Sequence, residues 1–389
     1  MRCPRLLSFS SSCLFVILVT MMVLSQSNPV PLVNQPNWLA VAQELHPGLT
    51  PPSGSRLPQG LPPGRRRIAG FKAAAPLSGA SQASGLNFAP AVPYGSGGYD
   101  AYSVVVADVN GDGKPDLLVA NNCFSSSSCV NGTVGVLLGN GDGTFQTAVT
   151  YGSGGYETLS LAVGDLNGDG KPDLVVANEC ASSTNCVNGT VGVLLGNGDG
   201  TFQTAVTYGS GGYDTLSLAV GDVNGDGKPD LVVANCGYCG TGNDSVGVLL
   251  GNGDGTFQTA VTYGSGGYEA TSVSVADVNG DGKPDLLVAS YCASSNCTSG
   301  SVGVLLGNGD GTFQTAVTYD SGGYDAYSVV VADVNGDGKS DLVVANECNN
   351  VYGCPNGSVG VLLGNGDGTF QAAVTYASGL RPFLWPSET

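Results

Sequence analysis

The sequence predicts an all-β fold, a β-propeller built from four-stranded blades. The acidic stretch Asp108-Val-Asn-Gly-Asp-Gly-Lys-Pro-Asp116 recurs four times, and the later copies begin at Asp165, Asp222, Asp277 and Asp333. The intervals between these positions are 57, 57, 55 and 56 residues, which indicates one structural unit copied five times. Each copy also contains three continuous apolar runs and one alternating run, the pattern of a sheet that is covered on both faces and has one outer edge.

The unit spanning residues 102 to 151 shows where the four strands are expected. Two apolar runs, Val104–Ala107 and Leu117–Ala120, flank the acidic stretch, and a third run covers Val134–Leu138. Residues Phe145 to Tyr151 alternate apolar and polar side chains, as a half-exposed edge strand does. Stacking the sheets face to face around an axis covers the inner strands, whereas an open row of sheets would expose an apolar face at each end.

Antiparallel connection places alternate turns on opposite faces of the blades. The acidic stretch and the turn Gly139–Gly143 share one face, called here the lower face. The loop Cys123–Cys129 and the link Gly152–Tyr156 to the next repeat lie on the opposite, upper face. We expect ligand-facing variation on the upper face.

Closure of the blades into a five-bladed ring is expected, ahead of a larger propeller completed by another copy. A lone fourth-strand sequence, Phe88–Tyr94, precedes the first full repeat and matches Phe370–Tyr376 at the other end. One of the two would complete a ring and leave the other redundant. Oligomerisation would follow if the propeller were incomplete.

The acidic stretch is predicted to bind calcium, about one ion per repeat. Ca²⁺ takes roughly six to eight oxygen ligands. Positions 1, 3, 5 and 9 carry side-chain oxygens, position 7 offers its carbonyl, and Gly113 at position 6 permits a sharp turn. The spacing resembles an EF-hand loop through nine residues, but Val119 stands where that loop has a bidentate glutamate, and strands flank it. A hairpin without metal would not require aspartate at positions 1 and 9 in every copy, whereas Asp142 and its equivalents are interpreted as plain turns.

The predicted metal ligands of the five copies are Asp108, Asn110, Asp112, Lys114, Asp116, Asp165, Asn167, Asp169, Lys171, Asp173, Asp222, Asn224, Asp226, Lys228, Asp230, Asp277, Asn279, Asp281, Lys283, Asp285, Asp333, Asn335, Asp337, Lys339 and Asp341.

Ten cysteines form one pair per repeat and predict five local disulfides, each closing an upper-face loop. The pairs are Cys123 and Cys129, Cys180 and Cys186, Cys236 and Cys239, Cys292 and Cys297, and Cys348 and Cys354. Cys236-Gly-Tyr-Cys239 has the spacing of a redox motif, but we interpret it as a shortened version of the same loop. Zinc is disfavoured because the pairs lie in separate blades and the sole histidine, His46, lies outside the repeats.

The two ends of the chain indicate secretion. Residues 1–27 are interpreted as a signal peptide, with an apolar run from Cys13 to Leu24 that is too short to span a bilayer, so no stable membrane anchor is expected. Residues 28–85 form a Pro- and Gly-rich linker or pro-segment, in which Arg65–Arg67 is either a processing site or a solvated cluster. The repeats cover residues 86–376, and residues 377–389 form a C-terminal tail.

The charge of the repeats argues against nucleic acid as a partner. Residues 86–376 carry 29 acidic side chains and five lysines, a net charge of −24. Fifteen of these acids are the aspartates of the five acidic stretches. About half of the negative charge therefore belongs to predicted metal ligands, and bound divalent cations would neutralise it.

The unit Ala107-Asp-Val-Asn-Gly-Asp-Gly-Lys-Pro-Asp-Leu-Leu-Val119, followed by Leu137-Leu-Gly-Asn-Gly-Asp-Gly-Thr-Phe145, resembles the FG-GAP and VCBS-type repeats of integrin-α-like propellers. The resemblance covers about 290 residues. It implies blades that hold calcium in the loop between the first and second strands. The literal Phe-Gly and Gly-Ala-Pro signatures are missing, and fewer repeats are visible than integrin propellers have.

The repeats favour a non-catalytic adhesion or binding module over an enzyme. Near-identical repeats supply five copies of every group, whereas catalysis needs one asymmetric constellation, and residues 86–376 contain neither histidine nor arginine. Five equivalent sites suit multivalent binding of an extracellular glycan or protein surface. The candidate contact residues follow the Gly-Gly links of the upper face and are Tyr99, Tyr156, Tyr213, Tyr268 and Tyr324. Packing of these tyrosines between blades is the alternative for the residues, and a propeller-type polysaccharide lyase or hydrolase is the alternative for the function.

Overall fold

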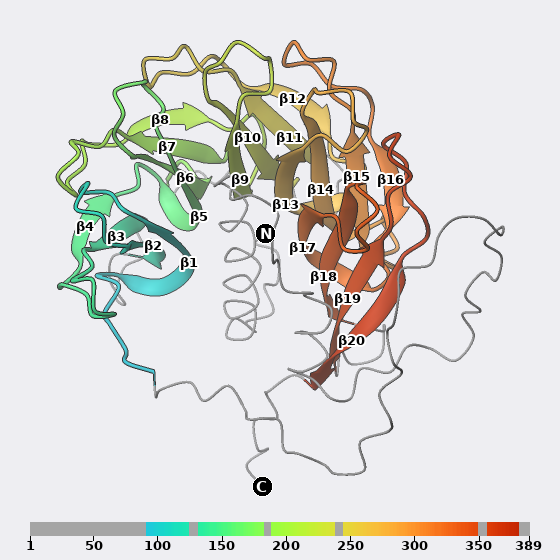
Figure 1. Ribbon diagram of the computed structural model, residues 1–389, viewed down its shortest axis with the longest axis horizontal. Coiled ribbons are helices and arrows are strands. Elements are labelled where there is room, and N and C mark those ends of the chain that lie inside the picture. Colours follow the sequence, from blue (N-terminus) through green and yellow to red (C-terminus); the bar gives the residue numbers. More distant parts are fainter. Residues whose placement is uncertain (1–90, 124–130, 183–187, 238–243, 349–355, 381–389) are drawn as a thin grey trace, which may run out of the picture. The chain divides into compact units, whose positions relative to one another are not determined.

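The computed structural model describes residues 91–123, 131–182, 188–237, 244–348 and 356–380. These residues form twenty β-strands in five four-stranded antiparallel sheets, and no helix occurs among them (Figure 1). The predicted all-β class with four-stranded, propeller-like blades is confirmed. The expected signal peptide and linker, residues 1–85, lie outside the described residues. Among the residues that are described, no helix has the length and apolar character needed to cross a membrane.

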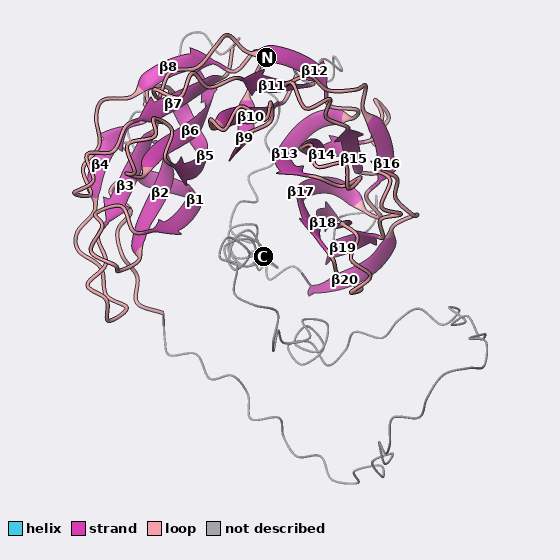
Figure 2. Cartoon of the chain, turned by 45° about the horizontal axis from the view of Figure 1, so that its top comes forward, coloured by secondary structure: helices cyan, strands magenta, loops and turns pink. Residues whose placement is uncertain are grey.

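Each sheet is one blade, and its strands pair in chain order. Blade 1 contains β1 (Tyr99–Ala107), β2 (Asp116–Cys123), β3 (Thr133–Leu137) and β4 (Val149–Gly152); blade 2 contains β5 (Tyr156–Gly164), β6 (Asp173–Cys180), β7 (Thr190–Leu194) and β8 (Val206–Gly209); blade 3 contains β9 (Thr215–Gly221), β10 (Asp230–Asn235), β11 (Ser245–Leu249) and β12 (Val261–Gly264); blade 4 contains β13 (Tyr268–Ala276), β14 (Asp285–Cys292), β15 (Ser301–Leu305) and β16 (Val317–Asp320); blade 5 contains β17 (Tyr324–Ala332), β18 (Asp341–Cys348), β19 (Asn356–Leu362) and β20 (Val374–Leu380). Figure 2 shows these strands with the loops that connect them.

The second and third strands of the inner blades are buried because the neighbouring blades cover both of their faces. In blade 2, residues 173–178 of β6 and all of β7 are buried. The fourth strands lie at the outer edge, and their first residues Val149, Val206, Val261 and Val317 are 54 to 56 % exposed. This contrast confirms the distinction that the sequence draws between continuous and alternating apolar runs.

Four apolar clusters join each blade to the next one in the chain. Between blades 1 and 2, the ring of Tyr151 packs edge-on against Phe202 with centroids 5.5 Å apart. Val109 is buried in the same cluster, and a side chain at Gly200 would approach Leu138 to 2.9 Å. We call the face of a blade that packs on the following blade its forward face, and the opposite face its backward face.

The other three interfaces repeat these contacts. The tyrosine and phenylalanine pairs are Tyr208 and Phe257, Tyr263 and Phe313, and Tyr319 and Phe370; the buried loop residues are Leu166, Val223 and Val278; the close approaches are Leu195 to Gly255, Leu250 to Gly311, and Leu306 to Gly368.

The forward face of blade 5 does not pack on blade 1 among the described residues. Val334 is 43 % exposed, whereas its four equivalents in blades 1 to 4 are 1 or 2 % exposed. The ring of Tyr94 lies 5.4 Å from Phe145 and takes the place that Tyr376 would need for blade 5 to close on blade 1. The expected closure of the fifth blade on the first is therefore not observed among the described residues, where Tyr94 packs on Phe145 in place of Tyr376.

One buried hydrogen bond is present in blade 2 and missing in blade 5. The Thr158 hydroxyl donates to Asn178 Oδ1 at 2.8 Å, and both side chains are buried. Ala326 takes the place of Thr158 in blade 5, where it pairs with Asn346. Within the described structure, the buried Oδ1 atom of Asn346 has no hydrogen-bond partner.

The substitution Thr158→Ala is expected to lower the free energy of unfolding by about 1 to 3 kcal/mol, because it leaves Asn178 Oδ1 buried without a donor. Ala326→Thr is expected to raise it by roughly 0.5 to 1.5 kcal/mol, because the new hydroxyl reaches Asn346. Urea unfolding measures both changes, and Ala326→Val is the control with the same shape and no donor. An Ala326→Val variant as stable as Ala326→Thr would contradict the role of the hydrogen bond.

Candidate functional site

The first eight residues of each acidic loop are shaped by hydrogen bonds from the backbone to side chains. Oδ1 of Asp108 accepts the amide of Gly111 at 2.8 Å, and Oδ2 accepts the amide of Gly113 at 2.8 Å. Both glycines have positive φ angles, 73° and 79°, which glycine adopts at little cost. Asn110 Oδ1 accepts the amide of Asp112 at 2.9 Å. The position-1 aspartate binds both glycine amides in the other four loops as well.

The ninth residue of each loop has a different environment, because it is buried. Asp116 is 0 % exposed; its Oδ2 accepts the amide of Val109 at 2.9 Å and its Oδ1 accepts the amide of Gly139 at 2.7 Å. These bonds tie the loop to the turn after the third strand, which confirms that both lie on the lower face. The residue at Gly139 must be glycine, because an added Cβ would lie 2.0 Å from the carbonyl oxygen of Pro115.

The same pair of amide bonds occurs in every blade. The aspartates and their donors are Asp173 with Leu166 and Gly196, Asp230 with Val223 and Gly251, Asp285 with Val278 and Gly307, and Asp341 with Val334 and Gly364. Sequence reasoning assigned these aspartates to metal alone and missed this structural role. The glycine that recurs 21 to 23 residues after each of them is the signal that could have revealed it.

The electrostatics of the loops separate the buried and exposed carboxylates. Burial raises the pKa of Asp173, Asp230 and Asp285. A hydrogen bond from the Lys114 amide lowers the pKa of Asp112, and amide bonds led by that of Gly338 lower the pKa of Asp333. Asp173, Asp230 and Asp285 therefore carry their charge at a cost, whereas Asp112 and Asp333 are stabilised as anions.

The lysine at position 7 of each loop was predicted to bind the metal through its backbone carbonyl. Its side chain also brings a positive charge to the loop. Lys114 Nζ lies 3.2 Å from Asp112 Oδ2, and the equivalent distance is 3.7 Å in blades 2, 3 and 4. These ion pairs are largely exposed, so each contributes little to stability. They place a positive charge beside the carboxylate that an incoming cation would share.

The oxygen atoms of the loops fit a hard cation by their chemistry, but in the described structure the three aspartates of a loop do not bring one carboxylate oxygen each within 4.8 Å of the others. Each loop offers exposed carboxylate and amide oxygens, which suit Ca²⁺. In the described part of the chain, the one group of three acidic or cysteine ligand atoms lying within 4.8 Å of one another is Glu179, Cys180 and Asp214, on the upper face. Cys180 is disulfide-bonded, so that group lacks a thiolate for a metal.

The five candidate tyrosines of the upper face differ in exposure. Tyr99 is 50 % exposed, whereas Tyr156 is 7 % exposed. The prediction of Tyr156 as a surface contact is therefore wrong, and its burial fits the alternative that these tyrosines pack between blades. The remaining three, Tyr213, Tyr268 and Tyr324, are half-buried.

An acidic residue in the left-handed region follows each of these tyrosines. Non-glycine residues rarely adopt positive φ, and such strain concentrates at functional sites. Each directly precedes the three-residue stretch in which the first strand of its blade shifts register against the second. The residues and φ angles are Asp100 (53°), Glu157 (54°), Asp214 (21°), Glu269 (57°) and Asp325 (57°). The sequence shows an acidic residue after the tyrosine in every repeat, but its left-handed backbone was not predicted.

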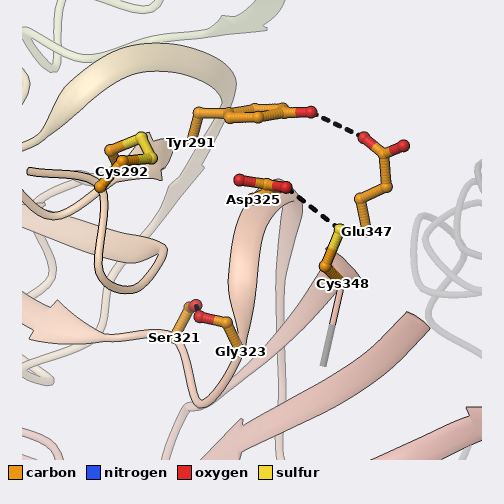
Figure 3. Close-up of a disulfide and its surroundings, with 8 residues drawn as sticks. Tyr291, Cys292, Ser321, Gly323, Asp325, Glu347 and Cys348 are labelled. Atoms are coloured by element: carbon orange, nitrogen blue, oxygen red, sulfur yellow. Dashed lines mark hydrogen bonds between the residues drawn. A yellow bond between two sulfur atoms is a disulfide. The ribbon is translucent and has the colours of Figure 1, made fainter. Parts of the chain in front are cut away.

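The upper face of blades 4 and 5 carries contacts that cross between blades (Figure 3). The Tyr291 hydroxyl donates to Glu347 Oε2 at 2.7 Å, and its ring lies 6.3 Å from that of Tyr327. Burial and the neighbouring Glu347 raise the pKa of Tyr291, so the phenol stays protonated. Asp325 Oδ2 lies 3.1 Å from the sulfur of Cys348.

Four of the five predicted disulfides are consistent with the structure. Cys292 is bonded to Cys297, as predicted. Cys123, Cys180 and Cys348 are disulfide-bonded, and their expected partners Cys129, Cys186 and Cys354 lie outside the described residues.

Cys236 is the exception, because it is a free, buried thiol. Its expected partner, Cys239, lies outside the described residues. The amide of Gly237 donates to Asp244 at 2.6 Å and holds the chain that follows Cys236. Burial raises the pKa of the Cys236 thiol, so it is an inert core residue rather than a redox nucleophile.

The buried and exposed aspartates are expected to differ in their effect on the metal-free protein. Asp285→Ala is expected to lower the free energy of unfolding by about 2 to 6 kcal/mol, because two buried amides lose their acceptor at roughly 1 to 3 kcal/mol each. Asp281→Ala, in the same loop and exposed, is expected to cost less than about 1 kcal/mol. Urea unfolding in the presence of chelator measures both; equal losses would refute the structural role of Asp285.

Family models match most of the repeat region. A model of the FG-GAP-like repeat matches residues 123–176, 180–233, 237–288 and 291–344, and a model of the FG-GAP repeat matches residues 101–137. The four FG-GAP-like segments alone cover more than half of the chain.

Curated relatives match part of the same region. A phosphatidylinositol-glycan-specific phospholipase D of Bos taurus is 31% identical over 158 residues, which are 34% of this chain and 18% of that protein. Integrin alpha-PS3 of Drosophila melanogaster is 30% identical over 153 residues, 35% of this chain and 13% of that protein. The chain thus spans less than a fifth of the length of these relatives.

Solved structures with a similar arrangement include the V. cholerae biofilm matrix protein Bap1, with a TM-score of 0.42 and 19% identity over 72% of this chain and 40% of that one. The GH43_1 enzyme from Xanthomonas citri complexed with xylose has a TM-score of 0.38 and 13% identity over 72% of this chain and 92% of that one.

Proposed function

The chain belongs to the FG-GAP repeat family, of integrin-α-like type, and we propose that it is a secreted, calcium-binding module that attaches to a glycan or protein surface without catalysing a reaction. The contrast between its two faces carries this proposal. The lower face repeats one hydrogen-bond pattern in all five blades, whereas the upper face differs from blade to blade in loop length, tyrosine exposure and charged residues. Variable loops on a constant scaffold are a common arrangement in proteins that recognise a ligand.

The side-chain composition of the repeats favours binding over catalysis. Residues 86–376 contain no histidine or arginine, and each of their five lysines lies in an acidic loop. The aspartates of the loops accept amide bonds, and those at position 9 are buried. A polysaccharide lyase or hydrolase is the second candidate, because some propellers are such enzymes and the upper face carries several carboxylates.

Calcium is proposed as the ion of the lower face. Asp108, Asn110 and Asp112 would supply exposed oxygens, and Asp116 would hold the loop in place from beneath. The negative charge of the repeats supports this proposal, because a divalent cation relieves repulsion among neighbouring carboxylates. Secretion is supported by the disulfide-bonded cysteines, which persist in oxidising compartments.

Calcium is expected to raise the melting temperature of the protein, since an ion that binds the folded state alone stabilises it by mass action. At a calcium concentration about 100 times the Kd, one site contributes roughly 2.7 kcal/mol. Thermal melts with calcium and with chelator measure the shift. The Asp281→Ala variant is the matched control: it should lose part of the calcium-dependent shift while its chelated melt stays close to that of the wild type. An identical midpoint with and without calcium would contradict the proposal.

Glycan or protein binding without turnover is expected at the upper face. A glycan array probed with the full chain, and incubation with the bound polysaccharides, separate the two candidate functions. The non-catalytic module predicts retention on defined glycans and no shortening of the polysaccharide over time. Accumulating products that disappear after Asp325→Asn would establish the enzyme instead, and Asp310→Asn, on the lower face, is the control.

A further inference from the structure

We infer that copies of this chain associate head to tail, with the forward face of blade 5 of one copy seated on the backward face of blade 1 of another. The two end faces are built from the same residues that pack together at the four interfaces inside the chain. Among the described residues of one chain, no blade packs on either end face, and Tyr94 contacts Phe145 on blade 1. The occupant is therefore a second copy, which carries the complementary face.

The forward face of blade 5 is an interior face without its covering blade. In blade 1, the forward-face residues of the second and third strands, Leu118, Ala120, Val134 and Val136, are 0 to 2 % exposed. Their equivalents in blade 5, Val343, Ala345, Val359 and Val361, are all partly exposed. Val334, at 43 % exposure, stands among them. These five residues are all apolar, and the alternation of β18 continues on the same side to Glu347 at the upper end.

Residues on the backward face of blade 1 are less buried than their equivalents in blade 5, because no preceding blade of the described structure covers them. Leu117, Val119 and Phe145 are partly exposed, whereas the equivalent backward-face residues of blade 5, Leu342, Val344 and Phe370, are buried. A Cβ added at Gly143 meets no atom within 4 Å. At the four equivalent glycines of blades 2 to 5, a Cβ would meet the leucine of the preceding blade at 2.8 or 2.9 Å.

The internal interfaces specify how the two faces fit. Leu306 covers Gly368 inside the chain, so its equivalent Leu363 would cover Gly143 of the next copy. The amide of Gly200 donates to the Val109 carbonyl at 3.2 Å, and Gly143 would donate to Val334 in the same way. One relative placement of the two copies would therefore allow both the apolar contact and the hydrogen bond to form.

For the proposed interface to form, Tyr376 of one copy must replace Tyr94 of the other copy on the ring of Phe145. Tyr319 packs on Phe370 inside the chain, and Tyr376 is its equivalent at the end, 36 % exposed. In a single chain the ring of Tyr94 packs edge-on against Phe145. Tyr94 is itself 36 % exposed and belongs to no strand. Tyr376 of the incoming copy would displace it. Because the two faces differ, the contact is heterologous and leaves one free end of each kind.

The test uses the full chain and two variants that each block one end. Val334→Lys places a charge on the forward face of blade 5, and Gly143→Asn fills the space for Leu363 while tolerating the positive φ of that turn. Val317→Lys, at an outer strand with 55 % exposure, is the control for an added charge on an exposed valine. Gly255→Asn is the internal counterpart of Gly143→Asn and is expected to destabilise the fold, because its Cβ would lie 2.8 Å from Leu195.

Sedimentation velocity over roughly 1 to 100 μM is expected to show wild-type chains whose mass grows with concentration. Val334→Lys and Gly143→Asn should each weaken the association at least about tenfold, and Val317→Lys should leave it unchanged. An equimolar mixture of the two blocking variants should form a 1:1 dimer and nothing larger, because it retains one intact interface. Circular dichroism melts verify that each variant is folded.

Three results would overturn the inference. A wild-type monomer at all concentrations, with a melting temperature that Val334→Lys lowers, would show that blade 5 closes on blade 1 of its own chain. A wild-type monomer that Val334→Lys leaves unchanged would show that the end faces have no protein partner of this sequence. Oligomers that both blocking variants preserve would place the contact on another surface.

Discussion

A buried carboxylate that binds two backbone amides in each blade is the interaction on which the rest of the structure depends. In blade 3, Asp230 accepts one hydrogen bond from Val223 and one from Gly251. The first bond sets the direction of the Val223 side chain, which is buried in the cluster shared with blade 4. The second bond anchors the turn that carries Gly255, the contact point for blade 2. One side chain therefore orients a blade toward both of its neighbours.

Most of the fold follows from the sequence, because strand pattern and turn chemistry are local. The continuous run Leu117–Ala120 and the alternating residues before Tyr151 predicted an inner and an outer strand, and both are observed. The role of Asp116 could not be predicted from its spacing, since a carboxylate is a suitable ligand for calcium and a suitable acceptor for two amides. The different exposures of Tyr99 and Tyr156 could not be predicted either, because the two residues occupy equivalent positions in the sequence.

The ends of the array could not be predicted because identical local sequences acquire different environments. Val278 and Val334 both stand in an Asp-Val-Asn-Gly-Asp-Gly stretch, yet they are 2 % and 43 % exposed. The difference arises from the next blade, which covers Val278 and is missing beside Val334. A repeat encodes how it packs on a neighbour and contains no signal for the number of neighbours.

The upper face is less symmetric than five equal repeats suggest, and this bears on how it would bind. The residues just before the first cysteine of each pair are Asn122 in blade 1, Glu179 in blade 2, Asn235 in blade 3, Tyr291 in blade 4 and Glu347 in blade 5. Tyr291 and Glu347 bond to each other across blades, and burial keeps the phenol protonated. This hydrogen bond links the second strands of blades 4 and 5 near their upper ends. A ligand would therefore meet a graded surface, with an exposed Tyr99 at one end and a fixed Tyr291–Glu347 bridge at the other, so selectivity would come from position along the array as well as from multivalency.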